Sequence, residues 1–442
     1  MTVNLPPKVK GLFLLGNILD FLEDPFAYVD MVASHGDVVR VNLAGQLIHY
    51  VFHPDDIEHV LLKNGSNYTK GTLMKRLEIV LGDGIFLKEG DAWKTQRKRM
   101  AHSFGHSFVS TLADPIAELA TRQLDGLEGV RNLDEDFMEL TLELVMRLLF
   151  GNTIGNDLDT LSESFNTIAV YFSKIMSQVS VPLWIPIPRN IRYNKSMKNL
   201  QVVIQRILDE RRTNGGDAHN DILSRILQDS DKLPALDEKQ IHDELRTLML
   251  AGHETTSLAL TYSTWFLSID SDLQEALFAE VQSVTGGKPI SGTDVQSLEL
   301  VSNTIREAIR ILPPAPIFGR ENIAADVLSG YDIPAGSTII LCPLRTQNDP
   351  RWFDAPEKFN PHRWTPQLKE KLPRFAYFPF GGGRRICIGM HLAMMESTII
   401  LAEVIRRYKI HRVEESRLEL MPSITLSTKS PMKLRLENRQ SM

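Results

Sequence analysis

A long stretch without proline, from Asp237 to Asp270, constrains the fold of this chain more than any other part of its sequence. Asp237 and Gln240 are spaced as a helix-capping pair, in which each side chain accepts a hydrogen bond from the other residue's backbone N–H. Apolar residues then recur at helical spacing, namely Ile241, Leu245, Leu248, Met249, Ala259, Tyr262 and Phe266. At 1.5 Å per residue such a helix would run about 50 Å. It would therefore cross a whole globular domain.

The rest of the chain predicts a mainly α fold with a minor β region. Helical periodicity dominates from about Asp91 to about Leu312, and another helix is expected from Gly389 to about Tyr408. We expect the β-rich part mainly at 37–65, 320–345 and 418–436, the last as a terminal hairpin. Because neither a linker nor a fixed-period repeat interrupts the 442 residues, we expect a single domain over 1–442.

Charge and cysteine content narrow the class of protein. A net charge of -6 does not favour nucleic-acid binding, which usually needs a basic surface. The two cysteines, Cys342 and Cys387, lie in very different contexts and indicate a reducing cytoplasm. The apolar run from Gly11 to Leu22 is shorter than the roughly 20 residues of a membrane span. Asn17 and Asp20 interrupt it, so we expect a soluble cytoplasmic protein without a membrane span or signal peptide.

The segment from Phe380 to Gly389, FGGGRRICIG, gathers three features around one cysteine. Its glycines permit positive φ angles and a close approach of the backbone to a flat ligand. Cys387 directly precedes a predicted helix, whose free N–H groups and dipole favour a thiolate over a thiol. Arg385 adds a cation that can bind a carboxylate through two hydrogen bonds.

Several kinds of site compete for this pattern. A single cysteine cannot complete a zinc or iron–sulfur site, and the chain has no CxxC pair. A phosphate-binding loop would need a Lys-Ser/Thr pair, which is missing here. A buried structural cysteine beside a glycine turn is the simplest alternative. One thiolate beside a carboxylate-binding arginine suits heme, which has an axial position to fill and two propionates.

The same segment resembles the FxxGxRxCxG motif of the cytochrome P450 family. Four further segments resemble motifs of that family in the expected order: Trp93–Arg97, Ala251–Thr256, Glu307–Arg310 and Pro356–Trp364. The resemblance covers essentially the whole chain. It implies the cytochrome P450 fold, with a long central helix over the heme, and a heme-thiolate monooxygenase of the soluble, bacterial type.

The resemblance also implies a set of cofactor contacts. Heme b would have Cys387 as the axial thiolate ligand of its iron. Further contacts would come from Phe380 against the sulfur, Gly389, Ala393 below the porphyrin and Ala251 on the opposite side. The implied donors to the propionates are Arg385, Arg97, Arg320 and the indole N–H of Trp93. For each arginine, the alternative is a cation on the solvent-exposed surface.

Two further groups take roles from the same resemblance. Glu307 and Arg310 share a helix face, and with Arg363 they resemble the buried triad of the family, a structural role. In the long helix, Gly252 costs about 1 kcal/mol relative to Ala, and Thr255 can turn its hydroxyl to a backbone carbonyl.

Both weaken the helix locally, and the resemblance implies that Thr255 and Glu254 are the catalytic residues. Thr255 would hydrogen-bond the iron-bound oxygen species and Glu254 would relay protons. A capped helix with a polar kink is the alternative, and His253 receives no role.

A lipophilic substrate is expected, because the residues that would line the pocket are apolar. By resemblance these are Leu77, Ile85, Phe86, Ile317, Phe318 and Leu426. A fatty acid, a terpenoid or a steroid would suit such a pocket. The run from Gly82 to Phe86 is also similar to bacterial fatty-acid hydroxylases of the family.

No electron-transfer module is recognisable in the sequence, so we expect a monomer that takes electrons from a ferredoxin or flavodoxin with its reductase, and oxygen as O2. Basic residues that would steer such an acidic partner are Lys94, Arg97, Lys98, Arg99 and Arg384. A solvated helix face explains the same charges equally well. A peroxide-driven peroxygenase or isomerase on the same fold is the alternative function, and a heme sensor or electron carrier is another.

Overall fold

The computed structural model describes residues 4–151, 157–174, 181–213, 221–228 and 235–439. The chain groups into two compact units, each assembled from separate stretches. The first unit comprises residues 1–75, 306–387 and 424–426, and the second unit comprises 76–305, 388–423 and 427–442. A single domain over 1–442 stays a prediction, which a test of whether both units unfold together would decide.

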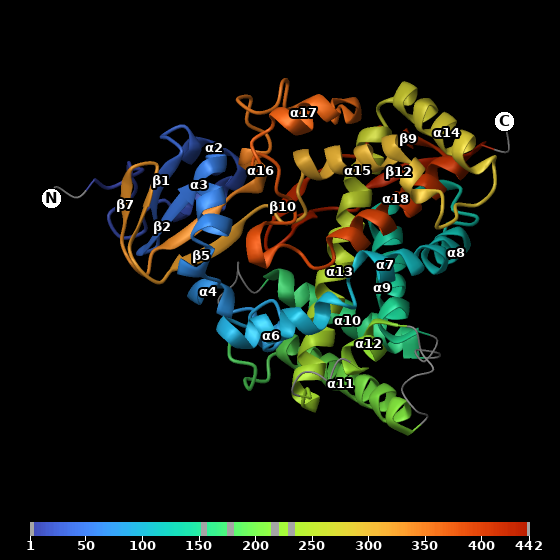
Figure 1. Cartoon of the computed structure of the whole chain (residues 1–442), viewed down its shortest axis with the longest axis horizontal. Coiled ribbons are helices and arrows are strands. Elements are labelled where there is room, and N and C mark those ends of the chain that lie inside the picture. The colour runs from blue at the N-terminus through green and yellow to red at the C-terminus, as the bar shows by residue number, and fades with distance from the viewer. Residues whose placement is uncertain (1–3, 152–156, 175–180, 214–220, 229–234, 440–442) are drawn as a thin grey trace. The chain divides into compact units, whose positions relative to one another are not determined.

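A five-stranded mixed sheet forms the centre of the first unit (Figure 1). Its strand order is β1-β2-β8-β5-β3; β2 and β8 pair in parallel, and the other neighbours pair antiparallel. The turn between the first two strands has positive φ angles at Ala44 and Gly45, as a tight hairpin requires. The strands of this unit are β1 (Val38–Leu43), β2 (Gln46–Val51), β3 (Tyr68–Thr69), β5 (Phe318–Asn322), β6 (Asp326–Leu328), β7 (Tyr331–Ile333) and β8 (Thr338–Leu341).

Alternating side chains of the sheet build one apolar core on each of its faces. Val39 and Tyr50 pack with Tyr28 on one face, whereas Val38 and Val51 point to the other. Short helices complete the unit. They are α1 (Ile18–Glu23), α2 (Pro25–Ala33), α3 (Pro54–Glu58), η1 (His59–Lys63), η2 (Gly65–Asn67), α4 (Gly71–Lys75), α16 (Pro343–Thr346), η7 (Pro361–Arg363), α17 (Pro366–Lys371) and η8 (Gly383–Arg385).

The second unit is mainly helical, and α13 runs through the middle of it (Figure 1). This helix packs most extensively against α9 and also contacts α18 and α5. The helices of the unit are α5 (Glu78–Leu81), α6 (Gly90–Ala101), α7 (His106–Thr111), α8 (Ala113–Gln123), α9 (Leu133–Phe150), α10 (Leu158–Lys174), α11 (Pro188–Thr213), α12 (Ile222–Gln228), α13 (Glu238–Leu267), α14 (Ser271–Thr285), η6 (Val295–Ser297) and α18 (Met390–Arg407). The boundary between the units falls within α15 (Glu299–Ile311).

The predicted long helix is confirmed, together with its cap. Asp237 accepts a hydrogen bond from the Gln240 N–H at 2.7 Å, and the Gln240 side chain accepts one from the Asp237 N–H at 3.1 Å. The helix has 30 residues, which corresponds to about 45 Å. It continues without interruption through Gly252 and Thr255.

The predicted β-rich ranges need correction in two places. Residues 54–63 are helical, because Pro54 occupies the first helical position and Asp55 and Asp56 lie in the first turn. The expected terminal hairpin divides: β10 (Leu420–Pro422) and β11 (Leu426–Thr428) pair with each other. β12 (Lys433–Asn438) instead lies between β4 (Gly129–Asn132) and β9 (Tyr408–Arg412).

Candidate functional site

The loop before Cys387 is held tightly against the first unit. Gly381 and Gly383 have φ angles of 69° and 62°, as the sequence predicts for a glycine turn. A Cβ at Gly383 would collide with the backbone carbonyl of Leu61, and one at Gly382 would collide with the ring of Phe375. Gly382 and Gly383 are therefore required by packing within the protein itself, whether or not a ligand also approaches them.

The two cysteines differ in exposure, and only one suits a ligand. Cys387 is exposed, and its N–H donates to the carbonyl of Phe380 at 3.0 Å. Cys342 is buried, and burial raises the pKa of its thiol to about 12. Cys342 is thus the structural cysteine of the pair, whereas Cys387 presents its sulfur at the end of the glycine loop.

Two of the predicted propionate donors lie in the first unit with this loop. Arg320 is 7% exposed on β5, where its guanidinium donates to the Gly319 carbonyl at 2.7 Å. It therefore does not match the alternative of a surface cation. Arg385 is half-buried in η8, and Phe380 is half-buried at the start of the loop.

Glu307, Arg310 and Arg363 form a connected ion-pair cluster in the first unit. Arg310 donates to both carboxylate oxygens of Glu307 at 3.0 Å, and Nε of Arg363 donates to one of them at 2.7 Å. Glu307 and Arg310 are fully buried. Both arginines also donate to backbone carbonyls between 354 and 358. Removing one partner would leave a buried charge unpaired, at a cost of about 3–5 kcal/mol.

The predicted catalytic turn lies within α13 of the second unit. The Thr255 hydroxyl donates to the Ala251 carbonyl at 2.8 Å, which is the bond that the sequence suggested. Ala251 is exposed and Thr255 is half-buried, whereas Glu254 is only 7% exposed. The exposed side of this turn therefore carries Ala251 and Thr255, and Glu254 lies within the protein.

His253 is a core residue rather than a ligand. Its ring is buried and packs edge-on against Phe165 at 4.7 Å between centroids. Burial lowers the pKa of His253 to about 4, so the imidazole is neutral at neutral pH. Within the described part of the chain, no group of three or more His, Cys, Asp or Glu side chains is arranged to hold a metal ion.

Glu396 on α18 is a buried acid that sequence reasoning missed. It is 5% exposed and contacts the hydroxyl of Thr256, the neighbour of Thr255 on α13. Burial raises the pKa of Glu396 to about 8, and the Thr256 hydrogen bond lowers it in part. A hydroxyl has one proton, and Thr256 also bonds the Gly252 carbonyl at 3.0 Å. The Thr256 hydroxyl therefore divides its one proton between the Gly252 carbonyl and the Glu396 carboxyl, both of which accept from it.

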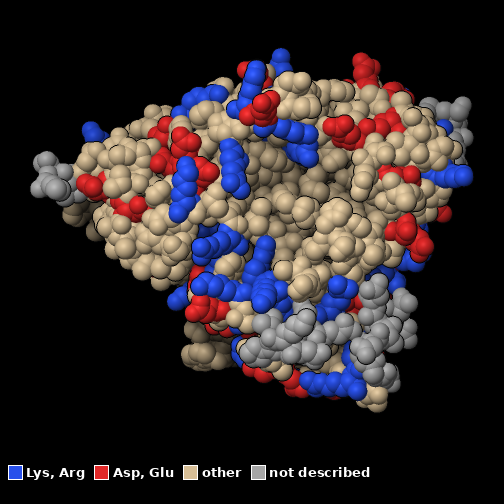
Figure 2. Space-filling view, viewed as in Figure 1, with Lys and Arg blue, Asp and Glu red and all other residues tan. Residues whose placement is uncertain are grey.

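The basic helix α6 is less open to a partner than predicted. Arg99 is 2% exposed and donates to Gln96 at 3.2 Å, so it does not belong to a surface patch. Lys94 is exposed and pairs with Asp91 at 2.7 Å, and Lys98 is also exposed. Figure 2 shows basic side chains gathered over the segment that holds α6. Trp93 is buried in this helix and Arg97 is half-buried.

A family model described as Cytochrome P450 matches residues 6–436 of the chain. The chain belongs to the cytochrome P450 family. It is similar to two proteins of Streptomyces melanosporofaciens: cyclooctatin synthase (27% identical, 97% of this chain and 95% of the relative) and cyclooctat-9-en-7-ol 5-monooxygenase (28%, 92% and 89%). Pentalenene oxygenase of Streptomyces avermitilis is 27% identical over 96% of this chain and 94% of its own.

A solved structure shows the same fold. Retinoic acid bound cyanobacterial CYP120A1 matches with a TM-score of 0.88 at 21% identity, over 99% of this chain and 100% of that chain. The predicted P450 fold and the class of enzyme, a P450 monooxygenase and thus an oxidoreductase, are confirmed. Membership of the family implies a heme-thiolate cofactor, a redox partner and O2. Among the helices described, none combines the length and apolar character that a bilayer span requires.

The residues of this P450 fit a heme-thiolate group. The first unit supplies one exposed thiol on a tightly held loop and two arginines that suit carboxylates. In the second unit, Gly389 is the N-cap of α18, and the Ala393 N–H donates to its carbonyl at 2.8 Å. The helix begins at Met390, three residues after Cys387 and one residue later than the sequence predicts.

The predicted pocket residues of the P450 divide between the units. In the first unit, Ile317 and Phe318 are half-buried, and Leu426 is fully buried with its N–H on the Pro314 carbonyl at 2.9 Å. In the second unit, Leu77 and Ile85 are buried and Phe86 is half-buried. Their shared role as a substrate pocket stays a prediction.

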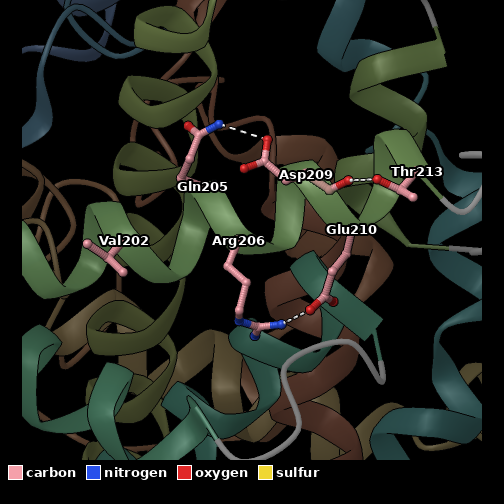
Figure 3. Close-up of a pocket in the computed structure, with 6 residues that line it drawn as sticks. All are labelled: Val202, Gln205, Arg206, Asp209, Glu210 and Thr213. Carbon is pink, nitrogen blue, oxygen red and sulfur yellow. Dashed lines mark hydrogen bonds and ion pairs between the residues drawn. The ribbon is translucent and has the colours of Figure 1, made fainter.

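A depression along α11 is a different kind of surface. Gln205 donates to Asp209 at 3.1 Å and Arg206 pairs with Glu210, so its polar side chains bind one another (Figure 3). It is lined from one helix alone, by Val202, Gln205, Arg206, Asp209, Glu210 and Thr213. We assign it no role in the P450 reaction.

Proposed function

We propose that this P450 inserts one oxygen atom from O2 into a lipophilic substrate, with heme b held by the thiolate of Cys387. The contrast between the two cysteines carries the proposal. Cys387 is exposed at the end of a glycine loop, whereas Cys342 is buried with a raised pKa. When bound, a heme with a thiolate ligand supplies O2 activation and O–O cleavage.

The protein's own residues would hold and orient this cofactor. Arg320 and Arg385 of the first unit, and Arg97 and Trp93 of the second, would donate to its carboxylates. Phe380, Gly389, Ala393 and Ala251 would make the remaining contacts. The Glu307 triad would keep residues 354–363 in place through its backbone contacts.

Proton handling would fall to Thr255 and Glu254. The Thr255 hydroxyl carries one proton, which it now shares with the Ala251 carbonyl. Turning this bond outward costs little on the exposed side of the helix, since the carbonyl can accept from water instead. Glu254 is buried, so its carboxyl would exchange protons through ordered water rather than bulk solvent.

Among lipophilic substrates, we favour a terpenoid over a fatty acid or a steroid. Two of the relatives have names that refer to cyclooctatin and to cyclooctat-9-en-7-ol, and a third is named as an oxygenase of pentalenene. The pocket residues proposed for this chain are apolar, which suits any hydrocarbon skeleton. The names of the relatives therefore give the preference.

We further propose that a ferredoxin or flavodoxin, with its reductase, supplies the electrons. Lys98 is exposed on α6, and an acidic partner would approach such a charge. Lys98→Glu should slow reduction at low salt, and the difference from wild type should shrink as salt rises. Lys288→Glu, at an exposed position after α14 of the same unit, makes the same change in net charge and is a suitable control. Equal reduction rates in wild type and Lys98→Glu would contradict this docking surface.

A spectral experiment tests the proposed function. The heme absorption spectrum of the wild type should show a thiolate-ligated heme that shifts when terpenoids are added. Cys387→Ser should lose the thiolate spectrum, while Cys342→Ser retains it. Products are then sought by mass spectrometry with reductase and O2, and separately with peroxide. Turnover with peroxide alone would favour the peroxygenase or isomerase, and a shift without product would favour a sensor.

A further inference from the structure

Two adjacent acids on α13 bind a short loop of the second unit. The Asp83 N–H donates to Asp243 at 2.9 Å, and the Ile85 N–H donates to Glu244, also at 2.9 Å. The loop, residues 82–86, follows α5 and contains the Gly-Asp-Gly-Ile-Phe run that the family motifs left unexplained. Asp243 and Glu244 are each 1% exposed. The loop is therefore hydrogen-bonded directly to the long helix.

The two glycines of this loop allow the close approach. A Cβ at Gly82, which has a φ of 66°, would collide with the Asp243 carboxylate, and a Cβ at Gly84 would collide with Thr247. The Thr247 hydroxyl in turn donates to the Leu81 carbonyl at 3.3 Å. Three consecutive contacts thus hold the backbone from 81 to 85 along one side of α13.

The two acids have different electrostatic surroundings. Asp243 is buried, which would raise its pKa, but bonds from Lys239 and the Asp83 N–H and the charge of Arg246 lower it overall. Its contacts with Lys239 and Arg246 keep it ionised at neutral pH. Asp243 is therefore the charged member of the pair.

Glu244 has a weaker set of partners. Burial raises the pKa of Glu244 to about 7, the Ile85 N–H and Lys88 lower it in part, and the charges of Asp243 and Asp83 raise it. Lys88 itself pairs with Asp83 at 2.8 Å. One carboxyl oxygen of Glu244 is buried without a hydrogen-bond partner. Burying an acid in this way lowers the stability of the fold, unless the hydrogen bond that it accepts from the loop offsets the cost.

We propose that Asp243 and Glu244 are positioning residues, which clamp residues 82–86 and thereby fix Ile85 and Phe86 as a wall of the substrate pocket. The role of Ile85 and Phe86 in the pocket rests on the proposed function. The clamp of residues 82–86 by the two acids does not depend on it. Ile85 takes its place because its own N–H is the group bound by Glu244. Loosening the clamp would alter substrate affinity and preference before it altered the chemistry.

Hydrogen exchange of the ligand-free holoenzyme tests the clamp. Glu244→Leu removes the acceptor of the Ile85 N–H, so exchange of residues 82–86 should rise at least about tenfold. Glu244→Gln keeps an acceptor of similar shape and should stay close to wild type. The matched control is Glu280→Leu, which takes a carboxylate from the Leu300 and Val301 N–H groups of the same unit. It should leave exchange of the loop unchanged.

The pH dependence of hydrogen exchange in residues 82–86 is a second measurement. A simple loss of packing would not change it. The pKa of Glu244 is raised from its usual 4.5 to about 7 when the loop is closed on it. Between these two pH values, Glu244 therefore binds more protons with the loop closed than with the loop opened. Opening should therefore become easier as pH rises from about 5 to about 7. Glu244→Gln should show no such dependence. If Glu244→Leu folds poorly, this profile still decides the proposal.

Retinoic acid serves as a lipophilic probe of the pocket. If it shifts the heme spectrum of the wild type, Glu244→Leu should weaken its binding about tenfold or more, and Glu280→Leu should not. Unchanged exchange of residues 82–86 in Glu244→Leu overturns the clamp. Raised exchange with unchanged affinity overturns its role in the pocket. If no lipophilic compound shifts the spectrum of any variant, the proposed pocket fails, and exchange alone decides the clamp.

Discussion

Glu396 and Glu403 are both buried on α18, seven residues apart, yet their surroundings are opposite. Glu403 is fully buried, pairs with Arg406 and Arg407, and also accepts from the Ile290 N–H. Glu396 contacts a threonine hydroxyl, and its pKa is raised to about 8 by burial. One helix therefore carries two different buried acids. Glu403 forms ion pairs with arginines, whereas Glu396 keeps its proton.

The difference shows how burial alone does not define the role of a carboxyl group. A buried acid with two arginines resembles Glu307 of the first unit, where ion pairs fix neighbouring backbone. A buried acid with only a hydroxyl partner is neutral near neutral pH and can donate a hydrogen bond. Glu396 accepts a hydrogen bond from the Thr256 hydroxyl of α13.

The largest expected effect is at the charged acid. Glu403→Leu would leave Arg406 and Arg407 without their shared carboxylate in a mostly buried place, at a cost of about 3–5 kcal/mol in the free energy of unfolding. Urea unfolding of the holoenzyme measures it. A loss below about 1 kcal/mol would contradict the ion-pair role of Glu403 and with it the contrast to Glu396.

The next effect concerns the neutral acid and depends on pH. The folded pKa of Glu396 is raised from 4.5 to about 8, so the folded state binds more protons than the unfolded state between these values. Its stabilising contribution is complete at low pH and is lost as pH rises towards 8. Unfolding free energy should fall by about 3 kcal/mol more from pH 5 to pH 8 in wild type than in Glu396→Gln. Parallel curves would contradict a raised pKa.

A smaller effect is expected at the partner of the neutral acid. Thr256→Val keeps the shape of the side chain but removes its hydroxyl, and should cost about 1–2 kcal/mol. Because the Thr256 bond lowers the pKa of Glu396, its loss should move the pH-dependent fall to higher pH. Thr264→Val, whose hydroxyl bonds the Leu260 and Thr261 carbonyls of α13, is the control and should leave the pH profile in place.

The smallest effect is expected at the edge of the ion-pair cluster. Arg407→Met leaves Arg406 on Glu403 and removes a partly exposed pair with Asp125. We expect a loss of less than about 1 kcal/mol, which should shrink further in high salt. Thermal unfolding at two salt concentrations measures it, and a loss comparable to that of Glu403→Leu would argue for a more tightly coupled cluster.

Local signals explain how much the sequence could predict. The capping pair at Asp237, the absence of proline after it and the glycine loop before Cys387 are each contained within a short window. The same kind of signal was overlooked at Pro54, where a proline followed by two acids begins a helix. That error concerned a boundary, since the strands before it lie where expected.

The missed residues depend on partners far along the chain. Glu396 meets a hydroxyl 140 residues away, and Asp243 and Glu244 meet N–H groups about 160 residues away. The helical pattern places an acid on a face, but it does not say what the other element offers there. Arg99 was misjudged for the same reason, because its burial comes from the tertiary packing of α6.

The contact between Gly383 and the Leu61 carbonyl has a practical consequence for redesign of the cysteine loop. Because the obstacle is backbone, no choice of side chain at 61 makes room for a larger residue at 383. A library that varies the loop alone would therefore sample almost only failures at this position. The cysteine loop and the π-helical turn η1 (His59–Lys63) therefore have to be transferred together when the loop is grafted onto another scaffold.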